Sequence, residues 1–263
     1  MTQAVPLLDA SNLQKRFGGI QALSDYSLIL EHGELVGLIG PNGAGKTTVF
    51  NVLTGVLSLS GGTIMFDGKD ITHLRATDTA RSGMARTFQN IRVFQNMTVL
   101  DNIKVGFHYV NGCGFWSTLF HTTGFRRSER DIEEQAAELA TMLGIEKYLF
   151  REASSLSYGY LRRLEIARAL ALSPKLLLLD EPVAGMNPNE TRELMHIIQQ
   201  INKELHLAIL LVEHDMHFIM NLCERIQVLN YGKLFAEGNA QEIQNNPKVV
   251  EAYLGSGAEK QML

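Results

Sequence analysis

The sequence predicts an α/β fold with a mainly parallel sheet, and three short apolar runs carry this prediction. Residues 34–40, 175–180 and 207–213 have the sequences ELVGLIG, KLLLLD and LAILLVE, in which apolar residues follow one another without alternation. Strands of this kind are buried on both faces, which is typical of parallel sheets covered by helices. Residues 225–229 repeat the pattern more weakly.

Amphipathic helices are expected between these strands, as an α/β architecture requires. After Asn187 and Pro188, which form a helix start signal, apolar residues at 194, 197, 198, 201 and 205 lie on one helix face. A second helix is expected after Ser128, with Gly144 closing it. The stretch from about residue 90 to 153 has helical patterns but no clear buried strand, so we expect a helical subdomain inserted into the α/β core.

Composition excludes several classes of protein. The 263 residues contain 24 Lys and Arg against 28 Asp and Glu, and this lack of a basic excess argues against a dedicated nucleic-acid binder. Two cysteines cannot form a disulfide scaffold or a four-cysteine zinc site, and they favour a cytosolic setting. The longest apolar run has six residues, whereas a membrane-spanning helix needs about 20. We therefore expect no transmembrane segment, and the N-terminal residues lack the features of a signal peptide.

A glycine-rich motif stands between a predicted strand and a predicted helix. Residues 40–47, GPNGAGKT, match the pattern G-x-x-x-x-G-K-[ST]. Its glycines let backbone N–H groups turn inward around phosphate oxygens at a helix N-terminus. Lys46 is expected to neutralise the β- and γ-phosphates, and the Thr47 hydroxyl to ligate Mg²⁺. The sequence therefore predicts a nucleotide phosphate site formed by Gly40, Pro41, Asn42, Gly43, Ala44, Gly45, Lys46 and Thr47.

Two carboxylates and a histidine end neighbouring predicted strands. Asp180 and Glu181 close the apolar run at 176–179, and ligands bind at the carboxyl ends of strands in open α/β sheets. Beside a phosphate loop, Asp180 is expected to hold Mg²⁺, directly or through water. Glu181 is expected to orient or deprotonate an attacking water. His214 ends the next strand on the same sheet edge and is a candidate for contacting a γ-phosphate oxygen.

Further motifs resemble those of the ATP-binding subunits of ABC transporters. Residues 156–160, LSYGY, stand in the place of the family's L-S-G-G-Q signature and depart from it at Tyr158 and Tyr160. The strings KRFGG, RTFQN and AGMN resemble the segment of the adenine-stacking aromatic, the glutamine loop and the D-loop, and His214 matches the switch histidine. The resemblance implies nucleotide binding by Phe17, Thr48, Gln89, Ser157 and Gly159, Mg²⁺ ligation by Thr47, Gln89 and Asp180, and catalysis by Lys46, Glu181 and His214.

The resemblance covers nearly the whole chain and implies a RecA-like P-loop NTPase core with a mainly parallel sheet, a small antiparallel β part and an inserted helical subdomain. We expect one ABC ATPase domain, with its core in 1–89 and 157–238, the helical insert in 90–156 and a C-terminal extension in 239–263. The cofactors implied are ATP and Mg²⁺. Each ATP would be sandwiched between two such subunits, identical or different.

The same resemblance implies partners and a location. The chain is expected at the cytoplasmic face of the inner membrane, bound peripherally to transmembrane permease subunits that dock near residues 90–125 and linked through them to an extracytoplasmic solute-binding protein. A group of aromatic residues in this region is expected either to pack within the insert or to contact that partner. The group contains Phe107, Tyr109, Phe115, Trp116 and Phe120.

Longer strings resemble the group that takes up branched-chain (hydrophobic) amino acids. They are RTFQNIRVFQNMTVLDNI, RRLEIARAL, DEPVAGMNPNET, LVEHDM and NPKVVEAYLG. The expected function is ATP hydrolysis that energises a multi-subunit importer of such amino acids, with import of amides or urea as an alternative.

Functions outside transport fit the sequence less well. An ABC ATPase of DNA repair or translation is disfavoured because the chain has one P-loop, no sustained heptads and no basic excess. A GTPase is disfavoured because the nearest string to N-K-x-D, at 202–205, lacks the Asp. A regulatory module that never hydrolyses nucleotide is disfavoured because Glu181 and His214 are both present.

Overall fold

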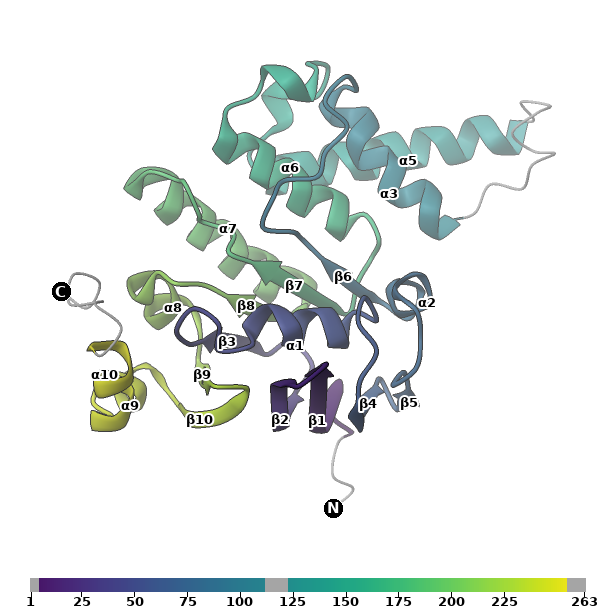
Figure 1. Ribbon diagram of the computed structural model, residues 1–263. Coiled ribbons are helices and arrows are strands. Elements are labelled where there is room, and N and C mark those ends of the chain that lie inside the picture. Colours follow the sequence, from purple (N-terminus) through teal and green to yellow (C-terminus); the bar gives the residue numbers. More distant parts are fainter. Residues whose placement is uncertain (1–4, 112–122, 255–263) are drawn as a thin grey trace. The chain divides into compact units, whose positions relative to one another are not determined.

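The computed structural model describes residues 5–111 and 123–254. The chain forms two compact units, and its path passes between them more than once (Figure 1). Unit 1 contains Met1–Arg86, Lys175–Pro182 and Ile198–Leu263. Unit 2 contains Thr87–Pro174 and Val183–Ile197. Phe115, Trp116, Phe120 and residues 255–263 of the expected C-terminal extension lie outside the described residues.

A mainly parallel sheet in unit 1 has the strand order β10-β9-β3-β8-β7-β6. Adjacent strands of this sheet run parallel to each other, except that β10 is antiparallel to β9. The three apolar runs are confirmed as strands whose residues are all buried, as the absence of alternation predicted. The strands are β3 (Leu35–Ile39), β6 (Met84–Arg86), β7 (Leu176–Asp180), β8 (Ala208–Val212), β9 (Arg225–Asn230) and β10 (Lys233–Gly238).

An antiparallel sheet, also in unit 1, has the order β2-β1-β4-β5 and confirms the expected antiparallel part. Buried and accessible residues alternate along much of β1 and β2, so each strand turns one face to the core. The strands are β1 (Leu8–Phe17), β2 (Ile20–Leu30), β4 (Gly61–Phe66) and β5 (Lys69–Asp70).

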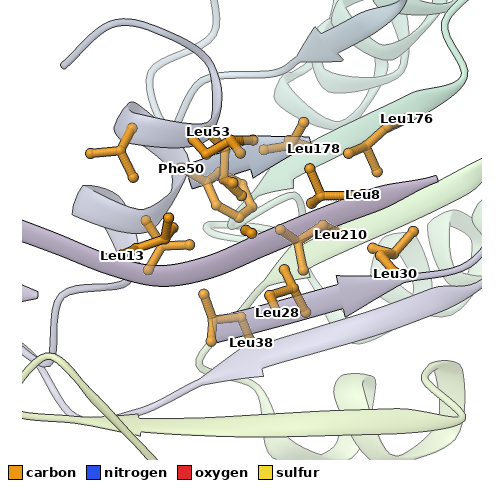
Figure 2. Packing of buried hydrophobic residues seen from close by; sticks show 14 of the residues in the cluster. Leu8, Leu13, Leu28, Leu30, Leu38, Phe50, Leu53, Leu176, Leu178 and Leu210 are labelled. Carbon is orange, nitrogen blue, oxygen red and sulfur yellow. The ribbon is translucent and has the colours of Figure 1, made fainter. Parts of the chain in front are cut away.

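One apolar cluster joins the two sheets of unit 1 through helix α1 (Lys46–Leu53), as Figure 2 shows. Leu8, Leu13, Leu28 and Leu30 come from the antiparallel sheet, Leu38, Leu176, Leu178 and Leu210 from the parallel sheet, and Phe50 and Leu53 from α1. Full burial of an apolar side chain of this size stabilises the folded state by about 1.5–3 kcal/mol. Because α1 is anchored by this cluster, the loop that leads into it is anchored as well.

Two of the other helices of unit 1 begin at a residue whose side chain caps the helix. Asp215 accepts a hydrogen bond from the Phe218 amide, and Asn239 forms a reciprocal capping box with Glu242. The helices are α2 (Ala76–Arg81), α8 (Met216–Leu222), α9 (Ala240–Gln244) and α10 (Pro247–Leu254).

Helix α7 (Pro188–Leu205) begins in unit 2 and ends in unit 1. The predicted start signal is confirmed, because the Asn187 side chain accepts from the amides of Asn189 and Glu190 while Glu190 accepts from the Asn187 amide. The predicted apolar face is buried at Leu194, Ile198 and Ile201, whereas Leu205, the last residue of the helix, is exposed.

Unit 2 is helical within the residues described, and helix α6 packs against both α3 and α5 (Figure 1). The expected insert, residues 90–156, belongs to this unit together with 87–89, 157–174 and 183–197, which were expected in the core. The expected helix after Ser128 is confirmed but begins earlier, at Thr123. The elements are α3 (Val99–Asn111), α5 (Thr123–Met142), α6 (Tyr158–Leu170) and the short 3₁₀ helices η1 (Glu146–Tyr148) and η2 (Ala153–Ser155). In the parts of the chain that the structure describes, no helix is long and apolar enough to span a bilayer.

Candidate nucleotide-binding site

The glycine-rich motif forms the connection between β3 and α1. Gly40, Gly43 and Gly45 have φ angles of 155°, 79° and 110°. Residues with a Cβ atom rarely adopt positive φ angles of this kind, whereas glycine adopts them readily. The connection therefore turns sharply and delivers the chain into the first turn of α1. Backbone N–H groups in a first turn lack intrahelical acceptors and carry a partial positive charge, which favours an anion.

Neighbouring backbone holds this loop in place. A Cβ added to Gly40 would lie 2.1 Å from the carbonyl oxygen of Leu229, and one added to Gly45 would lie 2.9 Å from that of Ala22. The Gly232 amide donates to the Ala44 carbonyl at 2.8 Å, which ties the loop to the β9–β10 turn. Gly43 differs, because no atom lies within 4 Å of an added Cβ. The loop is thus packed on its inner side and open at Gly43.

Lys46, the first residue of α1, points its ammonium across the loop. Nζ donates to the carbonyl oxygens of Gly40 at 2.6 Å and Pro41 at 3.1 Å, and the residue is 6% exposed. Burial lowers the pKa of Lys46 below its ordinary value, and the negative charges of Glu181 and Asp180 only partly offset this shift. The structure therefore brings the predicted phosphate-binding lysine into the field of the two predicted carboxylates at the end of β7.

Asp180 is held by a partner that sequence reasoning missed. Arg86, the last residue of β6, donates through Nη2 to Asp180 Oδ2 at 2.6 Å and through Nη1 to Asn51 Oδ1 at 2.6 Å. Both charged side chains are nearly buried, and the guanidinium also lies 5.3 Å from the centroid of the Phe50 ring. This link orients the carboxylate and ties β7 to α1. The available signal was the charged residue that begins the glutamine string RTFQN, residues 86–90.

Glu181 and His214 form a pair at the sheet edge, as their predicted strand ends imply. His214 Nε2 lies 2.5 Å from Glu181 Oε1. Glu181 has a φ of 48°, and its amide donates to the Val212 carbonyl at 2.9 Å. Left-handed backbone at a residue other than glycine costs about 1–3 kcal/mol and concentrates at functional sites. Buried Glu213, also missed, accepts from the His214 amide at 3.0 Å.

Phe17 ends β1 and precedes two glycines, so its ring stands at a strand end. The residue is 45% exposed, and the Lys15 ammonium lies 5.1 Å from the ring centroid. An exposed aromatic ring of this kind can stack on a planar ligand group.

Gln89, Ser157 and Gly159 belong to unit 2, whereas the other predicted site residues belong to unit 1. Gln89 is exposed. Ser157 is the N-cap residue of α6, is exposed and makes no side-chain capping hydrogen bond. Gly159 is buried, and a Cβ added to it would lie 3.0 Å from Glu190 Oε1. Close packing against the start of α7 thus favours a glycine in the first turn of α6.

The two tyrosines that depart from the signature pattern have different surroundings. Tyr158 is 43% exposed. Tyr160 packs against two residues of unit 2. Its ring centroid lies 4.7 Å from that of Tyr148 and 5.3 Å from the Arg163 guanidinium. An aromatic residue at position 160 is therefore explained by packing within unit 2.

The residues of unit 1 fit a nucleotide with Mg²⁺. The open face at Gly43 admits phosphate oxygens to the backbone, and buried Lys46 supplies a cation beside them. Within residues 5–111 and 123–254, no group of three or more His, Cys, Asp or Glu side chains is placed to hold a metal alone. Mg²⁺ is commonly bound by one or two carboxylates together with substrate phosphates, so Asp180 and the exposed Thr47 suit it.

Comparison with known proteins points to one family. A family model described as "ABC transporter" matches residues 23–184, and one described as "Branched-chain amino acid ATP-binding cassette transporter" matches residues 233–259. The chain is 44% identical to the high-affinity branched-chain amino acid transport ATP-binding protein BraF of Pseudomonas aeruginosa. It is 46% and 45% identical to the corresponding LivG proteins of Salmonella typhimurium and Escherichia coli. Each match covers 95% of this chain and 98% of the relative.

Solved structures give the same result. The ADP conformation of an ATP-binding cassette of an ABC transporter superposes with a TM-score of 0.82 at 30% identity, covering 96% of this chain and 100% of the other. A nucleotide-free ATP-binding cassette from an ABC transporter superposes with a TM-score of 0.80 at 31% identity, covering 95% and 99%.

Proposed function

This chain belongs to the ABC transporter family, and we propose that it binds and hydrolyses ATP as the energy-supplying subunit of a membrane importer for branched-chain or other hydrophobic amino acids. One observation carries the nucleotide part of this proposal. The glycine loop is packed on one side and open at Gly43, and buried Lys46 lies within it in the field of Asp180 and Glu181. The names of the relatives and the match of residues 233–259 support the amino-acid part.

The loop, Lys46 and the helix N-terminus together bind the phosphates. Backbone N–H groups of residues 40–48 surround the β- and γ-phosphates, with the Lys46 ammonium beside them. Thr47, Gln89 and Asp180 are the residues that would hold Mg²⁺, which when bound neutralises charge on the phosphate oxygens. Arg86 keeps the Asp180 carboxylate oriented, because its guanidinium donates to Asp180 Oδ2 and to Asn51 Oδ1 at the same time. Phe17 stacks on adenine.

Glu181 and His214 act on the reaction. Glu181 orients the attacking water and accepts its proton as the water oxygen bonds to the γ-phosphorus. The bond from the γ-phosphorus to the bridging oxygen breaks, and the products are ADP and phosphate. His214 Nε2 lies 2.5 Å from the Glu181 carboxylate and aligns it before nucleotide binds. With ATP bound, the same N–H donates to a γ-phosphate oxygen instead.

The signature segment acts on the nucleotide of a second subunit. Ser157 and Gly159 begin α6, where the helix dipole favours an anion. In a head-to-tail pair, identical or different in sequence, each ATP lies between one phosphate loop and the other subunit's Ser157. Because both subunits contact the γ-phosphate, its removal weakens their association. This difference in affinity between the ATP-bound and ADP-bound states drives the conformational change.

The remaining partners follow from family membership. The chain works at the cytoplasmic face of the membrane, where transmembrane permease subunits dock near residues 90–125 and an extracytoplasmic solute-binding protein delivers the solute. Within that range, Phe107 of α3 is buried and packs within its own unit, whereas Tyr109 of the same helix is 45% exposed and could contact a partner. Nucleic acid is not among the expected partners, since the chain has no basic excess.

Gly43→Ala tests the phosphate site, with Gly68→Ala as its matched control. The two glycines have φ angles of 79° and 73°, and neither has an atom within 4 Å of an added Cβ. Each substitution is expected to cost about 1 kcal/mol of unfolding free energy through backbone strain. Only Gly43→Ala should weaken ATP binding, by about tenfold or more, because its Cβ occupies the face that phosphate oxygens approach. Titration calorimetry and urea unfolding measure both effects, and equal ATP affinities for the two variants would contradict the site.

The transported solute is tested in the assembled importer. We expect the chain to co-purify with permease subunits, and the reconstituted complex to raise its ATPase rate severalfold when the binding protein carries leucine, isoleucine or valine. Stimulation by urea or short amides instead would identify the related importers of those solutes. Co-purification with DNA or ribosomes, without membrane subunits, would contradict a transport role altogether.

A further inference from the structure

Helix α6 carries a buried ion pair one turn after the signature segment. Arg162 Nη1 lies 2.7 Å from Glu165 Oε2, and the two side chains are 0% and 6% exposed. Taking two charges out of water is costly, and replacing such a pair by apolar side chains is often neutral or stabilising. Overall stability alone is therefore a weak explanation for a pair placed here.

Both members of the pair bind the backbone of the loop that contains Gln89. Arg162 donates to the carbonyl oxygens of Phe88 at 2.6 Å and Gln89 at 3.1 Å. Glu165 Oε1 accepts from the amides of Phe88 at 3.3 Å and Arg92 at 3.2 Å. The positive and the negative side chain thus hold the same loop, before and after Gln89, and all these residues belong to unit 2.

A third charged residue of α6 extends this attachment. Arg168 donates to the carbonyl of Arg92, and the Arg92 guanidinium lies 4.3 Å from the centroid of the Phe88 ring. Residues 87–94 form no helix or strand. Since this loop lacks the backbone hydrogen bonds of a helix or strand, side chains of α6 supply partners for its backbone groups and fix its conformation.

We propose that Arg162 and Glu165 are positioning residues that fasten the Gln89 loop to the signature helix, so that the two move as one piece. Ser157 precedes Arg162 by five residues, which is about 7.5 Å along a helix. A displacement of Gln89 on nucleotide binding therefore displaces Ser157 and Gly159, the groups assigned to the other subunit's nucleotide. The attachment rests on the contacts above, and its consequence for ATP rests on the proposed function.

The test removes both charges together, in Arg162→Met/Glu165→Met, so that no unpaired charge stays buried. The matched control is Lys104→Met/Glu129→Met, which removes an ion pair of 2.9 Å between α3 and α5 in the same unit. Hydrogen exchange of the amides of residues 88–92, measured without nucleotide, should accelerate about tenfold or more in the first variant, because it loses charge-assisted hydrogen bonds. The control should exchange as the wild type does.

Nucleotide measurements separate positioning from simple destabilisation. In Arg162→Met/Glu165→Met we expect an unchanged ATP dissociation constant, a kcat reduced about tenfold and a Hill coefficient for ATP that falls towards one. Arg162→Lys, which keeps the charge but not the planar fork that reaches two carbonyls, should lie between this variant and the wild type. It also serves as the test should the double variant not fold.

Unchanged exchange at residues 88–92 would overturn the proposal, as would faster exchange combined with a wild-type kcat and Hill coefficient. Absence of ATPase activity in the wild type and in the control has a different meaning. It would contradict the proposed function, whereas the attachment is measured by the exchange rates of protein without nucleotide.

Discussion

Replacement of Glu181 by Gln is expected to stop ATP turnover while leaving ATP binding intact. Gln keeps the size of the side chain and a polar atom facing His214, but it cannot accept the proton of the attacking water. The ATPase rate should fall about 100-fold or more, the usual contribution of a general base. The ATP dissociation constant should stay within about twofold, because binding rests on the phosphate loop. Steady-state phosphate release and titration calorimetry measure the two quantities.

Lys46→Ala is the contrasting variant. It removes the buried ammonium that bridges the Gly40 and Pro41 carbonyls, and so it should weaken ATP binding itself. In the presence of ATP, Glu181→Gln should also form a stable dimer on size-exclusion chromatography, since the nucleotide between the subunits persists. Equal ATPase rates for the wild type and Glu181→Gln would exclude Glu181 as the base or water-orienting group.

Gly40→Ala is expected to damage both the fold and the site, more than any other single change in the loop. Its Cβ would lie 2.1 Å from the Leu229 carbonyl oxygen, at a φ of 155°. Because that neighbour is backbone, β9 or the loop must shift, at a cost of about 3 kcal/mol from overpacking and strain together. Urea unfolding should show this loss, and ATP binding should become undetectable at the concentrations that saturate the wild type.

Gly43→Ala provides the comparison for this prediction. It places the same methyl group in the same loop, but in open space, and should cost about a third as much stability. An unfolding midpoint for Gly40→Ala equal to that of Gly43→Ala would show that the loop is not packed against Leu229 as described.

Much of unit 1 follows from local patterns. The buried strands were predictable because parallel strands have apolar residues on both faces, and β3, β7 and β8 show this over consecutive residues. In unit 2, the start of α7 was predictable for a similar reason, because its capping residues lie within four positions, 187–190. The short strand β6 was not predicted, since three residues carry no periodicity.

The candidate site likewise contains groups that local sequence patterns predict and contacts that they do not. The amino-acid order determines the phosphate loop, Lys46 and the two carboxylates, because each lies within one strand–loop–helix or strand-end pattern. It also makes Glu181 and His214 neighbours, once their strands are taken as adjacent.

Only the tertiary structure decided the partners that hold these groups. Arg86 and Asp180 are 94 residues apart, and Arg162 and Phe88 are 74 apart. Gly40 follows β3 and lies against Leu229 of the neighbouring strand β9. A charged side chain buried in a core needs a partner, but its own neighbours in the sequence do not determine which partner the fold supplies. The sequence by itself thus determined which chemistry this chain carries. The packing of distant segments decided how that chemistry is oriented and, through Arg162 and Glu165, how the Gln89 loop is fastened to the signature helix.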